Sequence, residues 1–225
     1  MKLKNKIIAL TAIAGLALVN AASFGAHHVK GGLGAKYVSD YNFRGALLSE
    51  EALQAQVALS ADLGQIEVFG KFFTNQTTDS LEADSNELTL GVGKTFLDGV
   101  LATYAGIYDM DVEGAETDAE VFLSVQVNTA LKPTLTYFRD TDAERNTFEG
   151  SVSQDFDLKF VELRLAGTLG NTELSDVLDR TYYGGSATVA KNVSENLEVY
   201  ADVALTDSDL RTKETQWGLG LALKF

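Results

Sequence analysis

Apolar and polar residues alternate over most of the chain. In the last segment, 214–225, one face carries bulky apolar residues and the other carries small or polar residues. Successive side chains of a β-strand point to opposite faces, so a period of two predicts strands. The same split recurs around 29–43, 53–60, 87–92, 120–128, 161–169 and 197–205, with weaker runs near 65–74, 100–109, 133–140, 146–155 and 181–191. Together these segments predict about twelve strands.

The connections between these strands alternate in length. Short connections fall at 62–64, 97–99, 128–132, 155–157 and 191–196, whereas longer, mostly acidic ones fall at 45–51, 75–86, 110–118, 140–146, 170–180 and 206–213. Short turns at one end and long loops at the other are typical of outer-membrane barrels. The pattern therefore predicts an all-β fold, a transmembrane antiparallel up-and-down β-barrel.

The strand register is open in two places. In the run near 65–74 the polar face would include Phe69 and Phe73, so its assignment to the lumen is uncertain from the sequence. The run near 133–140 holds the only Pro, Pro133, and is interpreted as a possible edge strand or bulge.

Alternation alone does not separate a membrane barrel from a soluble β-protein whose apolar face forms the core. An even number of strands lets the sheet close without an unpaired edge in lipid. Aromatic residues also lie near many predicted strand ends, as the interfacial girdles of a membrane barrel require. They are Tyr41, Phe43, Phe96, Tyr108, Tyr137, Phe148, Tyr183 and Trp217.

The last residue, Phe225, follows Trp217, Leu219, Leu221 and Leu223 at alternate positions. This arrangement resembles the C-terminal signal of bacterial outer-membrane proteins. The resemblance implies that the barrel-assembly machinery is a partner that reads this strand. A barrel in the outer membrane would also contact lipid and lipopolysaccharide.

The N-terminus has the composition of an export signal. A basic segment at 2–6 precedes an uncharged segment at 7–19, and small residues follow at 21–23. The uncharged segment is shorter than the roughly 20 residues that span a bilayer as a helix. We therefore predict a signal peptide at 1–21, cleaved near 21–23, and an outer-membrane barrel at 22–225.

The segment from Tyr37 to Gly45, YVSDYNFRG, resembles the opening signature of the TorF-family putative porins, and Leu53-Gln54 also fits. The chain departs from the family pattern at Ala46 to Ser49. The resemblance implies an outer-membrane barrel of about this size with a pore function.

Composition narrows the chemistry. The chain has no Cys, two His and a formal net charge of −14. Without Cys there is neither a disulfide framework nor a thiolate zinc site, and the negative charge disfavours binding to nucleic acid. His27 and His28 precede the first predicted strand, whereas nucleophilic catalysis needs rigidly held groups. We expect no enzymatic activity, no cofactor and no metal site.

The polar faces of the strands supply the candidate functional residues. If these faces point inward, the lumen holds nine acidic residues, Asp40, Glu67, Glu87, Glu120, Glu149, Glu162, Glu198, Asp202 and Glu214, and six basic residues, Lys30, Lys36, Arg44, Lys71, Arg164 and Lys224. The candidate pore-lining residues are Lys36, Asp40, Arg44, Glu67, Lys71, Glu87, Glu120, Gln126, Glu162, Arg164, Glu198, Asp202, Glu214 and Gln216.

An excess of carboxylates in a confined aqueous space attracts cations. The first hypothesis is therefore a passive channel for small hydrophilic solutes or ions with a weak preference for cations. The second is a closed structural or surface-interaction barrel whose acidic loops carry the function. A soluble exported β-protein is the third. Binding of acidic oligosaccharides is disfavoured because the predicted lumen is net acidic.

Overall fold

The structure is a computed structural model that describes residues 29–78, 83–114, 118–175 and 177–225. The predicted signal peptide and His27 and His28 lie outside the described residues. No helix in the described part of the chain is long and apolar enough to cross a membrane.

The described residues form twelve β-strands and one short 3₁₀ turn, η1 (Leu97–Gly99). The strands are β1 (Val29–Phe43), β2 (Ala46–Asp62), β3 (Glu67–Thr77), β4 (Ser85–Phe96), β5 (Leu101–Val112), β6 (Asp118–Val127), β7 (Thr134–Asp140), β8 (Asn146–Asp157), β9 (Glu162–Ser175), β10 (Leu178–Asn192), β11 (Leu197–Ser208) and β12 (Arg211–Lys224). The predicted number of strands is confirmed.

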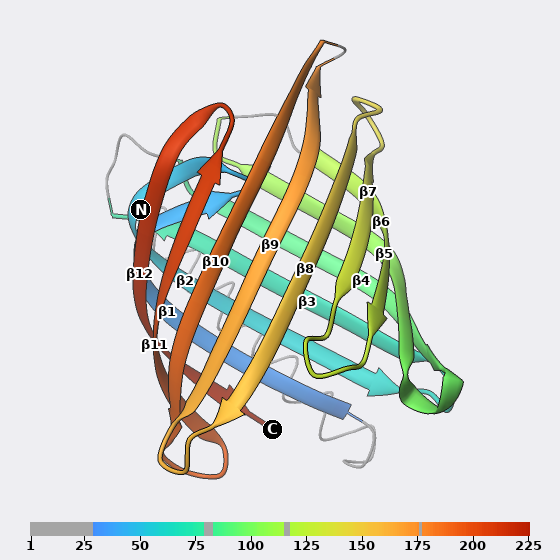
Figure 1. Cartoon of the computed structure of the whole chain (residues 1–225), viewed down its shortest axis with the longest axis vertical. Coiled ribbons are helices and arrows are strands. Elements are labelled where there is room, and N and C mark those ends of the chain that lie inside the picture. The colour runs from blue at the N-terminus through green and yellow to red at the C-terminus, as the bar shows by residue number, and fades with distance from the viewer. Residues whose placement is uncertain (1–28, 79–82, 115–117, 176) are drawn as a thin grey trace.

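The strands form one closed, antiparallel barrel in which each strand pairs with its sequence neighbours and β1 pairs with β12 (Figure 1). Gly32 lies opposite Lys224 at this closure, and Gly31 and Phe225 exchange two backbone hydrogen bonds of 2.8 and 3.0 Å. Closure leaves no unpaired sheet edge, so the backbone groups of the wall are satisfied within the sheet. The predicted all-β up-and-down barrel is therefore confirmed.

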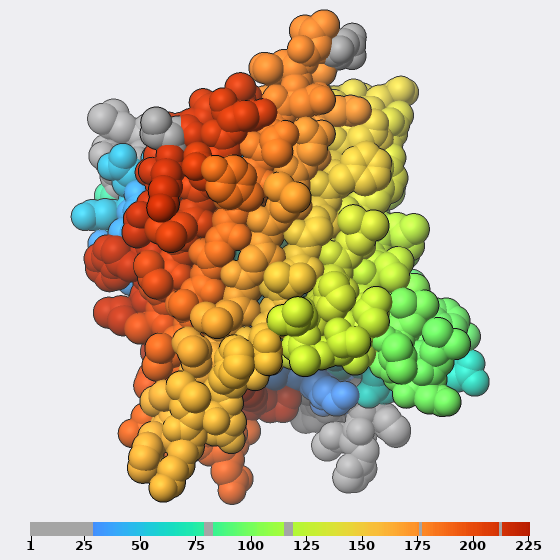
Figure 2. Space-filling model, viewed as in Figure 1, coloured from blue at the N-terminus to red at the C-terminus, as the bar shows by residue number. Residues whose placement is uncertain are grey.

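Apolar side chains cover the outside of the barrel rather than a central core. Along β12, Trp217, Leu219, Leu221 and Leu223 remain between 41 and 57% exposed. The outer surface over β7 to β12 is continuous in the space-filling view (Figure 2). Large apolar side chains are exposed on strands all around the barrel, among them Leu53, Leu90, Leu123 and Leu169, and such an exterior suits lipid rather than water.

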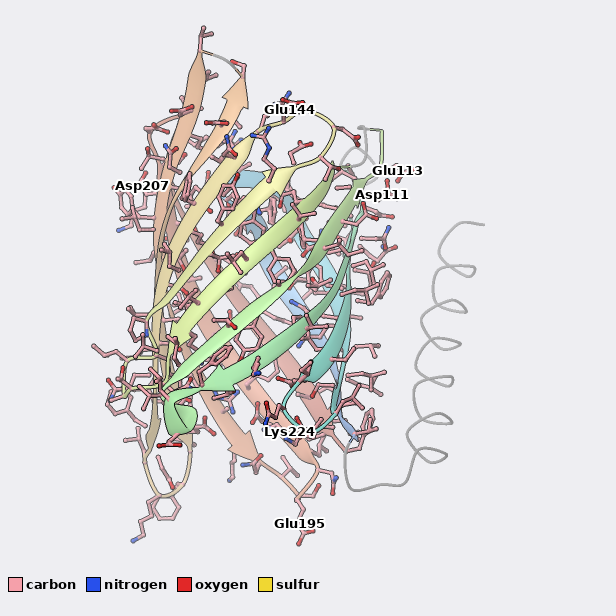
Figure 3. The ribbon with its side chains drawn as sticks, turned by 90° about the vertical axis from the view of Figure 1, so that its right-hand side faces the viewer. Asp111, Glu113, Glu144, Glu195, Asp207 and Lys224 are labelled. Carbon is pink, nitrogen blue, oxygen red and sulfur yellow. The ribbon has the colours of Figure 1, made fainter. Side chains whose placement is uncertain are left out.

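The two ends of the barrel differ in their connections. At the turn end, where β1 begins and β12 ends, the connections are 63–66, 97–100, 128–133, 158–161 and 193–196. The short connection predicted at 155–157 is wrong, because β8 continues to Asp157 and the turn follows it. At the opposite, loop end, 78–84 is the longest connection, whereas 113–117 and 141–145 are no longer than 128–133 at the turn end. Parts of 78–84 and 113–117 lie outside the described residues. The labelled acids Asp111, Glu113, Glu144 and Asp207 lie toward the loop end, whereas Glu195 and Lys224 lie toward the turn end (Figure 3).

Three predicted loops at the loop end are wrong. The segments 45–51, 170–180 and 206–213 are mostly strand, with only two residues between β1 and β2, between β9 and β10, and between β11 and β12. Acidic composition suggested loops, but polar residues continue the ladder because backbone hydrogen bonding does not depend on the side chain.

The two segments of open register are also resolved. Phe69 and Phe73 share the inner face of β3 with Glu67 and Lys71. The strand β7 is neither an edge nor bulged, because it pairs with both β6 and β8 in continuous register. Pro133 precedes the strand, so its missing N–H removes no bond from the ladder.

Candidate functional site: the barrel lumen

The register of the sheet places most of the predicted pore-lining residues on its inner face. These are Lys36 in β1, Glu67 and Lys71 in β3, Glu87 in β4, Glu120 and Gln126 in β6, Glu162 and Arg164 in β9, Glu198 and Asp202 in β11, and Glu214 and Gln216 in β12. Alternation along each strand and direct pairing across strands bring them to one side.

Asp40 lies where β1 and β2 become irregular beyond Val38, and its described side-chain contact is with Ser39 rather than with another predicted pore-lining residue. The register between them shifts at Tyr41, and Glu51 on the opposing strand has a φ of 43°. The Asp40 carboxylate accepts a hydrogen bond of 2.7 Å from its neighbour Ser39. A bulge changes which side chains face inward, and here Tyr41 rather than Asp40 reaches a lumen residue, Glu87.

The same irregularity corrects part of the predicted outer aromatic girdle. Tyr41 and Phe43 lie inside, because Tyr41 donates a hydrogen bond to Glu87 and Phe43 stacks on Tyr108 with ring centroids 6.1 Å apart. Tyr108 also lines the lumen and is only 9% exposed. By contrast, Phe96, Phe148, Tyr183 and Trp217 are 40 to 54% exposed on the outside, and Tyr137 packs on Phe148.

One side of the lumen is a network of ion pairs, which we call the paired half. The Lys36 ammonium lies 2.8 Å from the Asp202 carboxylate. Arg164 contacts both Glu162, at 2.7 Å, and Glu198, at 2.6 Å. Lys224 lies 3.1 Å from the same Glu198. These basic side chains are therefore neutralised by neighbouring acids rather than forming a free basic surface.

The tip of the β1–β2 hairpin, residues 43–46, folds into the lumen. Gly45 is buried and its carbonyl accepts a hydrogen bond of 3.3 Å from Ser208 in β11. A Cβ at this position would lie 2.8 Å from Tyr182 and 2.9 Å from Ser208, and the φ of Gly45 is +73°. Both the close approach and the positive φ require glycine. The hairpin tip thus packs against the inner wall of β10 and β11.

Arg44 extends from this tip to the opposite wall. Its two terminal nitrogens bind both oxygens of Glu120 in β6, at 2.6 and 2.7 Å. Its guanidinium lies 4.4 Å from the ring centroid of Phe138 and 4.9 Å from that of Phe43. The side chains of Arg44 and Glu120 are only 11 and 8% exposed. Arg44 therefore bridges the lumen through a bidentate ion pair and cation–π contacts.

The second side of the lumen carries a connected set of rings, which we call the aromatic half. Phe69 packs against Tyr104 and Phe122, Phe122 packs against Phe138, and Phe138 packs against Tyr108, which stacks on Phe43. The centroid distances lie between 5.9 and 6.5 Å. This half therefore presents ring faces and edges where the other half presents charges.

Arg44 separates cavities on its two sides. A cavity of about 600 Å³ is lined by the aromatic half together with Glu67, Glu149 and Arg44; we call it the aromatic cavity. A second cavity of about 220 Å³ toward the loop end is lined by Arg44, Asp140, Arg145 and Arg180 among others. A third, of about 350 Å³, lies beside the Lys36–Asp202 pair. The lumen thus contains open space on both sides of the Arg44–Glu120 bridge.

The aromatic half was missed by the sequence analysis, although a local signal for it exists. Phe122 lies two residues from both Glu120 and Ser124, so strict alternation places it on the same inner face. Tyr104 and Tyr108 are separated by an even number of positions in β5, so alternation places both on the same face of that strand. What alternation did not indicate is that these rings, from separate strands, form one wall.

A closed antiparallel barrel with an apolar exterior and a charged interior has the architecture of outer-membrane porins and channels. Solved structures of this class are similar to the chain. The KdgM porin superposes with a TM-score of 0.58 at 11% identity, covering 86% of this chain and 99% of KdgM. The NanC porin gives 0.56 at 10% identity, covering 86% and 100%. An outer membrane channel from Pseudomonas putida F1 gives 0.55 at 8% identity, covering 88% and 95%.

At these identities the likeness concerns the fold, which is that of a porin-type outer-membrane barrel. The similar structures are named as porins and channels rather than enzymes. No family model matches the chain, and no curated protein is detectably similar in sequence. The TorF-family resemblance of residues 37–45 therefore stays a prediction. The described residues contain no group of His, Cys, Asp and Glu arranged to hold a metal ion.

Proposed function

We propose that the chain is an outer-membrane channel for passive diffusion of small hydrophilic solutes, with a weak preference for cations. The observation that carries this proposal is the open space on both sides of Arg44 inside a closed barrel. A barrel filled completely by its own side chains would leave no such space. The porin fold of the similar structures supports the same proposal.

The preference for cations follows from the charges that remain after pairing. Glu67, Glu87, Glu149 and Glu214 form no ion pair among the described residues; Glu87 and Glu149 accept hydrogen bonds from tyrosine hydroxyls. Lys36, Arg44, Arg164 and Lys224 are all paired with acids. The inward Lys71, and Arg145 and Arg180 in the cavity at the loop end, form no ion pair among the described residues and offset part of this negative charge. Carboxylates without a cationic partner hold the lumen potential negative.

This charge distribution disfavours acidic solutes. One structure of the KdgM porin is described as a complex with disordered oligogalacturonate, an acidic saccharide. In this chain the basic residues of the paired half are occupied by Glu162, Glu198 and Asp202. For this reason we do not propose oligogalacturonate as a ligand of this lumen, although the fold is shared.

The proposal also includes a location in the outer membrane, partners there, and removal of a signal peptide. The apolar exterior would contact outer-membrane lipid, and the loop end would face lipopolysaccharide. The strand that ends at Phe225 would engage the barrel-assembly machinery, after removal of residues 1–21 by signal peptidase.

The hairpin tip supports a second candidate function. Because residues 43–46 contact β6, β10 and β11, the tip could close the lumen completely. The chain would then be a closed structural or surface-interaction barrel whose acidic loop end carries the function.

Planar-bilayer recordings of the refolded chain separate the two candidates. A channel gives stable conductance steps and a cation-selective reversal potential across a potassium chloride gradient. Arg44→Ala removes the bridge to Glu120 and is expected to raise conductance about twofold or more. Lys71→Ala, which alters an inward lysine with no ion pair in the described residues, is the control for loss of a lumen cation.

Each result has a distinct meaning. A folded, inserted barrel that never conducts, together with conduction in Arg44→Ala, would overturn the channel proposal and support a barrel closed by its hairpin tip. Anion selectivity in the unmodified chain would leave the pore but contradict the charge argument.

A further inference from the structure

The aromatic cavity combines two features that together select a class of ligand. Its walls include the rings Phe43, Phe69, Tyr104, Tyr108, Phe122 and Phe138. It is also lined by Glu67 and Glu149, neither of which forms an ion pair among the described residues. Ring faces carry partial negative charge and attract cations, while carboxylates supply full negative charge.

Arg44 shows that these rings accept an organic cation. Its guanidinium lies 4.4, 4.9 and 5.8 Å from the centroids of Phe138, Phe43 and Tyr108. A planar cation therefore already occupies one end of the ring wall. Phe69, Tyr104 and Phe122 extend the wall beyond the reach of this side chain.

Arg44 does not make the cavity repulsive to a second cation. Both of its terminal nitrogens bind the Glu120 carboxylate, so the pair contributes no net charge. The inward Lys71 is not among the residues that line the cavity, and its ammonium lies over the ring of Phe73. Glu67 and Glu149 therefore set the sign of the field there.

We propose that the aromatic cavity binds small organic monocations, meaning amines or quaternary ammonium compounds with a compact apolar body. Its volume of about 600 Å³ lies in the range of small-molecule sites. An inorganic cation would gain from the carboxylates but little from apolar contact with six rings. This inference rests on the proposed function only in that the ligand enters through the water-filled lumen.

Binding to the folded barrel in detergent micelles tests the proposal without requiring conduction. Isothermal titration calorimetry would compare choline with 3,3-dimethylbutan-1-ol, an uncharged isostere in which a carbon atom replaces the quaternary nitrogen. Choline is expected to bind at least about tenfold more tightly, because only the cation interacts with the rings and carboxylates.

Variants locate the site. Glu149→Gln removes the charge but keeps an oxygen that accepts from Tyr182, and should weaken choline binding about fivefold. Phe122→Leu keeps every charge and should weaken it about threefold. Glu195→Gln and Phe160→Leu, in turns outside the lumen, are the matched controls and should leave the affinity unchanged. Retarded migration of unheated protein in gels would verify folding of each variant.

The outcomes distinguish this inference from the channel proposal. Equal affinity for choline and dimethylbutanol, or binding of glucose in place of choline, would overturn the cation site even in a conducting barrel. Loss of choline binding in Glu149→Gln but not in Phe122→Leu would reduce the site to a charge effect and overturn the role of the rings. Choline binding to a barrel that never conducts would sustain the site and refute the channel.

Discussion

The two halves of the lumen share one strand pattern but use it differently. In the paired half, Lys36, Arg164 and Lys224 are neutralised by acids on the same strand or on strands one or two positions away in the sheet. In the aromatic half, rings occupy the equivalent inward positions, and the main cation, Arg44, arrives from the hairpin tip rather than from the wall. Alternation identifies the inner face only as the face that points away from lipid. That face therefore contains two chemically distinct surfaces.

The difference indicates a division of roles. Ion pairs within β9, between β11 and β12, and across one intervening strand connect the wall and leave little free charge in that half. The aromatic half encloses the largest of the described cavities and borders the Arg44–Glu120 bridge. Selection of solutes is therefore expected in the aromatic half.

The largest expected effect breaks the bridge between the hairpin tip and the aromatic half. Arg44→Ala leaves the mostly buried Glu120 carboxylate without its cation, and is expected to lower the free energy of unfolding by about 3 kcal/mol. Arg164→Ala, in the paired half, should cost about 1 kcal/mol, because Glu198 retains Lys224. Urea unfolding followed by Trp217 fluorescence would measure both. Equal losses of unfolding free energy in the two variants would show that removing one cation destabilises both halves of the lumen to the same extent.

A smaller effect is expected from adding a methyl group at a glycine that is closely packed against a ring. A Cβ on Gly106 would lie 2.1 Å from the Leu90 carbonyl oxygen and 2.9 Å from the Phe122 ring. Gly106→Ala should therefore cost about 2 kcal/mol, since strand pairing and ring must both shift.

Gly150→Ala is the matched control, because its Cβ would meet nothing closer than 3.9 Å. Its unfolding free energy should change by no more than about 0.5 kcal/mol. If Gly106→Ala were equally neutral in the same urea titration, close packing of rings on the inner wall would not be a stabilising feature.

The smallest effects concern ion selectivity. Asp202→Asn removes an acid and releases Lys36, whereas Glu214→Gln removes an acid with no ion pair in the described residues. Both substitutions make the lumen potential less negative. Reversal potentials should therefore shift toward the equilibrium potential of chloride by roughly a few millivolts. The shift should be larger for Asp202→Asn, because the freed ammonium becomes available to anions. A larger shift for Glu214→Gln would mean that Lys36 stays shielded in the paired half.

The amino-acid sequence by itself determined the barrel and its two faces. Alternation is a local consequence of strand geometry, so Trp217, Leu219 and Leu221 could be assigned to the outside without knowledge of any contact. Parity also brought Glu162, Glu198 and Glu214 to the inner face. The three misassigned loops show the limit of composition, because acidic residues do not end a strand whose backbone is paired.

Only the tertiary structure decided which inward residues meet. Arg44 and Glu120 are 76 residues apart, and Lys36 and Asp202 are 166 apart. Their contacts depend on closure of the sheet, on strand register and on the bulge near Tyr41 that turns the hairpin tip inward. Alternation fixes the face of each strand, but not the distance across a lumen, because that distance is set by all the strands together.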